Sequence, residues 1–79
     1  MANFYFTFGS NQAFPYGRDD FVQVVADDIR EAVTIFRQHH QNRPGSNLVN
    51  CAFWYTEDEF SKFREEFYPG REPVETLTA

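Results

Sequence analysis

The segment FVQVVADDIREAVTIFRQHH, residues Phe21–His40, decides the fold that we expect of this chain. It opens with the run Phe21–Val25, rich in β-branched residues, which predicts a strand. Asp27 and Asp28 follow, and their carboxylates suit a helix N-cap and the positive end of the helix dipole. The next apolar residues recur with helical spacing, which predicts one amphipathic helix with a stripe formed by Ile29, Ala32, Val33, Phe36 and His40.

Two further strands are predicted, one on each side of this segment. Residues Asn3–Phe8 alternate with period 2, with three phenylalanines on one face and Tyr5 on the other, which suits a central strand. Residues Leu48–Tyr55 form the other candidate, in which Phe53 and Trp54 point to opposite faces. We expect Trp54 to share the open face of the sheet with Tyr5.

A second helix should follow the last of these strands. Thr56 and Glu59 have the spacing of a capping box, in which each residue satisfies a backbone N–H near the other. The phenylalanines that follow recur with helical spacing, so we expect the helix to bury Phe60, Phe63 and Phe67. Proline and glycine end both predicted helices.

The order of elements is strand, strand, helix, strand, helix, in a single domain of residues 1–68 followed by an extended or disordered tail, residues 69–79. The rule of right-handed crossovers and the aromatic first strand favour a three-stranded antiparallel sheet in the order second, first, third. This predicts an α+β two-layer sandwich with the main helix packed on one face. The position of the second helix, and thus the cover of the other face, stays open.

Composition limits the classes of partner. Ten Phe, four Tyr and one Trp in 79 residues provide either a dense core or aromatic side chains for a partner. The net charge of −5 disfavours binding to a phosphate backbone, and it favours a basic partner or simply solubility. A single cysteine, no signal-peptide pattern and no long apolar run predict a cytoplasmic protein without a membrane span.

No residue pattern predicts catalysis, a metal site or a cofactor. His39 and His40 are adjacent and so about 100° apart on a helix, which prevents them from binding one metal ion together. Cys51 suits a small buried hydrophobe, because a nucleophilic thiol needs an exposed, electropositive setting. We therefore expect a protein that is not an enzyme.

The loop Gly9–Asp20 is long for a connection between two strands, and such loops often carry function. Phe14 and Tyr16 bring aromatic bulk into it, either as a lid on the core or as contacts for a ligand. Asp19 and Asp20 have no capping role that would explain them, so they are candidates for contact with a basic partner.

An exposed pair of Tyr5 and Trp54 would be similar to the stacking platforms of RNA-binding sheets, but the basic rim of such sheets is missing. We therefore expect no direct binding of nucleic acid. A single nucleotide-like ligand needs less positive charge. Tyr16 and Trp54 could stack on its base, and Arg18 or Arg43 could contact its phosphate group.

Several motifs together resemble those of a known group of sequences. They are FYFTFGS at residues 4–10, FPY at 14–16, VVADD at 24–28 with the helix entry that follows, and NCAFWYTEDEF at 50–60. The chain resembles, over residues 3–63, a family of short, mostly uncharacterised proteins encoded by phages, prophages and mobile elements of anaerobic Gram-positive bacteria. The shared motifs are strand aromatics, turns and caps, so the resemblance implies no active-site residue.

This resemblance implies a setting in which small acidic proteins inhibit host machinery, as anti-CRISPR and other anti-defence proteins do. We therefore expect a non-enzymatic protein that binds a host or defence protein with a basic surface. The expected contact residues are Tyr5, Phe14, Tyr16, Arg18, Asp19, Asp20, Trp54, Glu57 and Asp58. Two alternatives stay open: a homodimer or larger homo-oligomer that sequesters a small ligand or nucleotide, and a structural assembly subunit.

Overall fold

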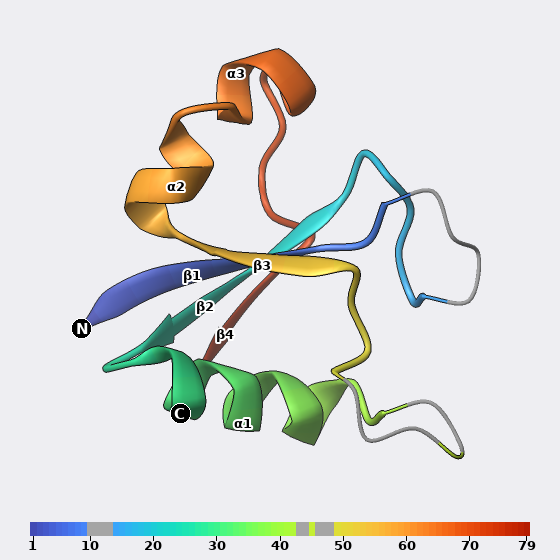
Figure 1. Cartoon of the computed structure of the whole chain (residues 1–79), viewed down its shortest axis with the longest axis vertical. Helices are drawn as coiled ribbons and strands as arrows, with labels where there is room; N and C mark the ends of the chain where they lie inside the picture. Colours follow the sequence, from blue (N-terminus) through green and yellow to red (C-terminus); the bar gives the residue numbers. More distant parts are fainter. Residues whose placement is uncertain (10–13, 43–44, 46–48) are drawn as a thin grey trace.

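The computed structural model describes residues 1–9, 14–42, 45 and 49–79. Within these residues a mixed sheet lies between one long helix and two short ones (Figure 1). The elements in chain order are β1 (Ala2–Thr7), β2 (Phe21–Ala26), α1 (Ile29–His39), β3 (Phe53–Thr56), α2 (Glu57–Ser61), α3 (Arg64–Phe67) and β4 (Glu75–Thr78). The predicted α+β class is confirmed. The predicted helix stop at Arg43 and Pro44 and the predicted strand start at Leu48 lie outside the described residues.

Strand β1 lies inside the sheet, as predicted. It pairs antiparallel with β2 and with β3, and the complete order is β3-β1-β2-β4. Phe4 and Phe6 point to one layer and Tyr5 points to the other, and all three side chains are buried. A strand that is apolar on both faces requires cover on both faces, and the helices provide it.

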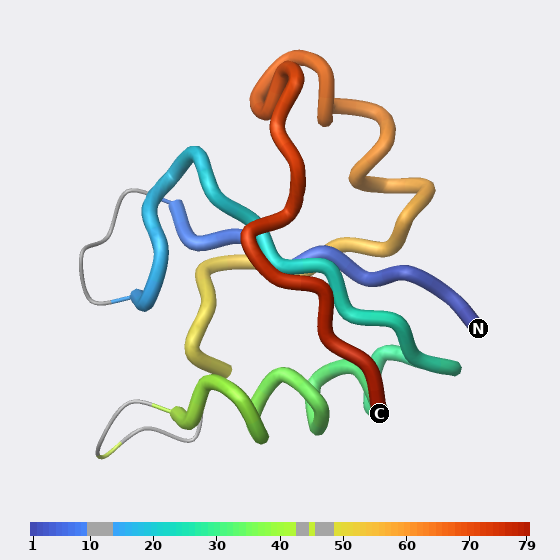
Figure 2. The backbone as a smooth tube through the Cα atoms, turned by 180° about the vertical axis from the view of Figure 1, so that it is seen from behind, coloured from blue at the N-terminus to red at the C-terminus, as the bar shows by residue number. Residues whose placement is uncertain are grey.

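Strand β4 corrects the prediction for the end of the chain. Of the two predicted forms, extended or disordered, residues 75–78 have the extended one, but as strand β4 they pair parallel with β2 and make the sheet four-stranded and mixed (Figure 2). The Val74 N–H donates to the Phe21 carbonyl over 2.9 Å just before the strand begins. Leu77 then buries its side chain in the core beside α1. This one apolar residue in a polar run anchors the strand.

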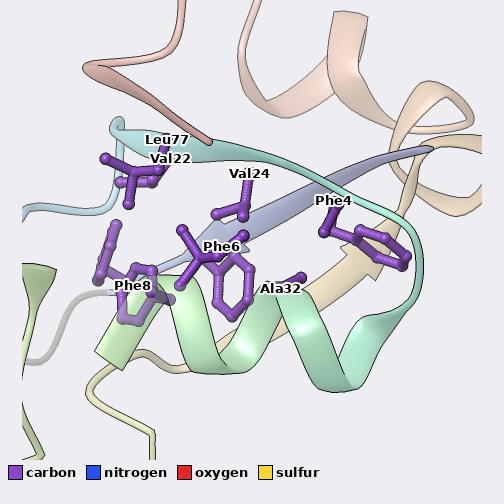
Figure 3. Packing of buried hydrophobic residues seen from close by; sticks show 10 residues of the cluster. Phe4, Phe6, Phe8, Val22, Val24, Ala32 and Leu77 are labelled. Atoms are coloured by element: carbon purple, nitrogen blue, oxygen red, sulfur yellow. The ribbon is translucent and has the colours of Figure 1, made fainter. Parts of the chain in front are cut away.

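Helix α1 begins where the carboxylates predict. Asp28 is the N-cap and accepts a hydrogen bond from the Glu31 N–H at 2.8 Å, while the Glu31 carboxylate accepts from the Asp27 N–H. The helix packs on the face of the sheet that carries the β1 phenylalanines (Figure 3). The Phe6 and Phe36 rings stack with centroids 4.5 Å apart, which places α1 directly over the centre of the sheet.

A second apolar cluster covers the opposite face, so the sheet lies in a three-layer arrangement and not in the two-layer sandwich predicted. Helix α2 begins with the predicted capping box, in which Thr56 and Glu59 each satisfy the other's backbone. The box directs Phe60 onto the sheet, where its ring stacks on that of Tyr5 with centroids 4.4 Å apart. Phe21 and Tyr68 complete the buried set.

Strand β3 is shorter than predicted, and Trp54 lies on the face opposite to the one expected. Residues 49–52 bend before the strand, with the Cys51 N–H bonded to the Val49 carbonyl and the Ala52 N–H to the Thr7 carbonyl. From Phe53 onward the strand pairs with β1, and Trp54 lies directly across from Phe6. Directly paired residues point to the same face, so Trp54 lies on the α1 face.

None of the helices in the described part of the chain combines the length and the apolar character that a membrane span would need.

Candidate functional site

The structure separates the contact residues predicted from the sequence. Tyr5 is only 6% exposed beneath Phe60, so it cannot contact a partner as predicted. Phe14 and Tyr16 pack against the core beside α1, which favours the lid over the ligand contact. The Tyr16 ring meets Phe8 edge-on at a centroid distance of 5.3 Å.

The predicted acidic residues are also dispersed. Glu57 bonds to the Asn3 side chain at the beginning of β1, whereas Asp19 lies beside Thr7 at the end of that strand. Asp20 closes a turn by accepting from the Gly17 N–H at 3.1 Å. The carboxylates of the loop and those of α2 therefore do not form a single acidic site. Asp58, in the first turn of α2, is exposed.

The aromatic groove is the main candidate site. It is a hollow of about 380 Å³ between the end of β1, the loop before β2, β3 and the α2–α3 segment. Its lining consists of Thr7, Gly9, Arg18, Asp19, Phe53, Tyr55, Phe63, Phe67 and Tyr68. Of the predicted contact residues, Arg18 and Asp19 belong to this lining.

Exposed phenyl rings form the rim of the aromatic groove. Phe53 is 63% exposed and Phe67 61% exposed, although the sequence pattern placed both among buried residues. The Tyr55 and Phe63 rings meet edge-on behind them, with centroids 4.8 Å apart. Exposed aromatic rings over a packed aromatic base are typical of surfaces that bind other proteins.

The polar groups in the floor of the groove already have partners. The Thr7 hydroxyl donates to the Phe53 carbonyl at 3.3 Å, and it also shares a hydrogen bond with the Tyr68 phenol. Burial raises the pKa of Tyr68, and the nearby carboxylates of Asp19 and Asp20 add to this effect, so the phenol is neutral. The floor therefore offers mainly apolar contact.

Charge is concentrated at the loop end of the groove. The Arg71 guanidinium lies 3.8 Å from the Asp19 carboxylate, and both side chains are largely exposed. Arg18 makes no ion pair with any residue that the structure describes, so its charge is available to a ligand.

The Trp54 hollow lies on the other side of β3. It is a shallow depression of about 430 Å³ against α1, lined by Ile29, Arg30, Val33, Thr34, Arg37 and Trp54. Trp54 is 44% exposed in it. The two arginines, seven positions apart on α1, give this depression a basic character that contrasts with the apolar groove.

The residues weighed for chemistry have structural roles. Burial raises the pKa of the Cys51 thiol to about 11, so the thiol is protonated at neutral pH. His40 Nε2 lies 2.5 Å from the Glu75 carboxylate, which joins the end of α1 to β4. Across the described ranges, no group of three or more side chains is arranged to hold a metal ion.

Comparisons with protein-family models, with curated proteins and with solved structures returned no match. Five members of the groove, namely Phe53, Tyr55, Phe63, Phe67 and Tyr68, were not recognised as one site from the sequence. The surplus of aromatic residues was compatible with either a dense core or a surface for a partner, and the members of this groove come together only through the pairing of β3 with β1 and the fold of α2 and α3.

Proposed function

We propose that this chain is a non-enzymatic binding protein that takes apolar side chains of a partner protein into the aromatic groove. The observation that carries the proposal is the exposure of Phe53 and Phe67 on the rim of one hollow. Two largely exposed phenyl rings cost free energy in an isolated molecule, and covering them by a partner recovers it.

The surroundings of the groove fit protein recognition. Binding energy at protein interfaces is concentrated in a few aromatic and arginine residues surrounded by groups that exclude water. Phe53, Phe67 and Arg18 have this character. The floor beneath them holds satisfied polar groups, so an apolar side chain can enter without leaving a donor or acceptor unpaired.

The class of partner that we propose comes from the resemblance of the sequence to small proteins of phages and mobile elements. Because the chain resembles small proteins of phages and mobile elements, a host or defence protein is the partner that we propose. The contact that we expect is different from the one first predicted, since it is aromatic and apolar at its centre and charged only at the loop end of the groove.

Site-specific photocrosslinking tests this function. Phe67 is replaced by the photoreactive residue p-benzoylphenylalanine, and the matched control carries the same residue in place of Thr78, which is exposed on β4. We expect irradiation in a host lysate to link a distinct protein to the Phe67 variant alone, and Phe53→Ser added to that variant to abolish the product. Identical products from both positions, or none from either, would contradict the proposal.

A small ligand is a second candidate because Arg18 faces the groove without an ion pair among the described residues. The volume of about 380 Å³ is near the lower end of that of small-molecule sites. An aromatic anion such as a nucleoside monophosphate would place its ring on Phe53 and its charge at Arg18. A shift of the melting temperature with such compounds, lost in Arg18→Gln, would favour this candidate over protein binding.

A further inference from the structure

Strand β3 joins the two candidate surfaces, because it lies at an edge of the sheet and its residues alternate between the two faces. Phe53 and Tyr55 line the aromatic groove on one face, and Trp54 lines the Trp54 hollow on the other. A partner that pairs with the outer side of β3 would reach both surfaces at once.

The backbone of β3 has a pair of hydrogen-bonding groups that point outward. The Thr7 carbonyl accepts from the Ala52 N–H, so the backbone groups of Thr7 point toward β3. Those of Phe53, which pairs with Thr7, therefore point inward, and those of Trp54, the next residue, point outward. The Thr56 N–H also points outward, but the capping box uses it, since it donates to the Glu59 carboxylate at 3.0 Å.

The pairing elsewhere in the sheet gives the same result. The Phe21 carbonyl of β2 accepts from Val74 on the β4 side, so Val22 directs its backbone groups toward β1. Phe6, which pairs with Val22, therefore directs its own groups toward β2 and away from β3. Trp54, paired with Phe6, is left with its N–H and C=O facing out of the sheet.

We propose, resting on the function proposed above, that the outer edge of β3 receives a strand of the partner protein with an apolar–acidic–apolar sequence. The residue opposite Trp54 would exchange two hydrogen bonds with it, and its side chain would lie on the α1 face. An acidic side chain there meets the basic Trp54 hollow with Arg30 and Arg37. Its two neighbours point to the other face, where apolar side chains contact the aromatic groove.

Charge complementarity favours a foreign strand over a second copy of this chain. Paired with itself, β3 would bring only Phe-Trp-Tyr-Thr to the basic hollow, and none of these side chains is acidic. The strand is also short and offers one closely spaced pair of hydrogen bonds, so side chains on both faces must add to the affinity.

Two synthetic peptides test the proposal by NMR titration of the isotopically labelled chain. One is acetyl-Ser-Thr-Val-Glu-Val-Thr-Ser-amide, and the matched control has lysine in place of glutamate. We expect saturable shifts of the Trp54 amide with the glutamate peptide, and binding about tenfold weaker with the lysine peptide. The variant Arg30→Glu should weaken or reverse this preference, since the Arg30 side chain is exposed.

A third peptide tests the backbone contact directly. N-methylation of the central glutamate removes the donor that would bond to the Trp54 carbonyl, and it should abolish the shifts. Equal binding of the glutamate and lysine peptides, unchanged binding after N-methylation, or no shift at Trp54 would overturn strand addition. Shifts at Phe67 without shifts at Trp54 would overturn strand addition but leave the proposed function of the groove intact. Photocrosslinking from Phe67 tests that function separately.

Discussion

Three phenylalanines that recur with helical spacing have three different environments. Phe60 is 1% exposed between Tyr5 and Phe21, Phe63 is partly buried, and Phe67 is exposed. The helix that would have kept them on one stripe is interrupted after Ser61, and α3 begins anew at Arg64. A residue's place in a sequence pattern thus decides its burial only while the helix continues.

This difference predicts unequal costs for the same substitution. We expect Phe60→Ala to lower the free energy of unfolding by about 3–5 kcal/mol, because it removes a buried ring and leaves a cavity. Phe67→Ala should change it by no more than about 0.5 kcal/mol. Urea denaturation measures both. A cost at Phe67 close to that at Phe60 would show that its ring is buried in solution, for instance by self-association.

The capping box at the start of α2 should contribute measurably to stability. Thr56→Ala removes the hydroxyl that accepts from the Glu59 N–H, and it should cost about 1 kcal/mol of unfolding free energy. Thr56→Ser should recover most of the loss, because it restores the hydroxyl. Ser61→Ala, which removes an exposed hydroxyl bonded to the Asp58 carbonyl, is the matched control. Equal effects at Thr56 and Ser61 would argue against capping.

At the scale of elements, β4 depends on a contact with the end of α1. Burial alone would raise the pKa of Glu75, but hydrogen bonds from His40 and Tyr16, together with the charge of His40, outweigh it and lower the pKa below 4.5. The same cluster also includes His39 and Asp20, whose charges act on Glu75 and on Tyr16 respectively. The loop before β2, the end of α1 and β4 therefore meet at the Glu75 carboxylate.

This lowered pKa predicts a loss of stability in acid. The unfolded chain protonates Glu75 more readily than the folded one. The stability that Glu75 contributes to the folded state is therefore complete above about pH 4.5, and it is lost as the pH falls through the lower pKa of the folded state. We expect Glu75→Gln to flatten the decline of unfolding free energy between about pH 6 and about pH 3. Glu72→Gln, at an exposed position, is the control and should leave the decline unchanged.

The elements that depend on local signals could be predicted from the sequence, and those that depend on distant pairing could not. The N-cap at Asp28, the capping box at Thr56 and the alternation of β1 are local, and all three are confirmed. Strand β4 has one apolar residue, Leu77, so its signal is weak until β2 is present to pair with it. Trp54 was placed on the wrong face because a bend at residues 49–52 shifts the alternation, and nothing in the sequence marks that bend.

The same distinction applies to the candidate site. Arg18 was proposed as a phosphate contact and Asp19 as a contact for a basic partner, and both line the aromatic groove. Phe53 and Phe67 were assigned to buried faces because an aromatic residue in a strand or helix pattern is usually buried. Their exposure results from β3 being at the edge and from the break between α2 and α3, which are properties of the assembled sheet.

At the scale of the whole molecule, the sheet separates two apolar clusters that share the backbone of β1 and β2. Loss of either cluster would leave those strands open on one face. We therefore expect a single cooperative unfolding transition for a chain of this size. Trp54 fluorescence reports the α1 side, and near-ultraviolet circular dichroism reports mainly the tyrosines of the other side. Separate midpoints for the two signals would contradict this coupling of the layers.

The parallel pairing of β4 with β2 also determines where the chain enters and leaves the fold. Ala2 lies across from Ala26, and Thr78 lies beside Val25, so both ends flank the last residues of β2. They are two strand spacings apart, or about 10 Å. A short linker could close the chain into a ring, and a new opening at the exposed Gly45 would give a circular permutant. The same geometry suits the molecule for insertion into a surface loop of a carrier protein.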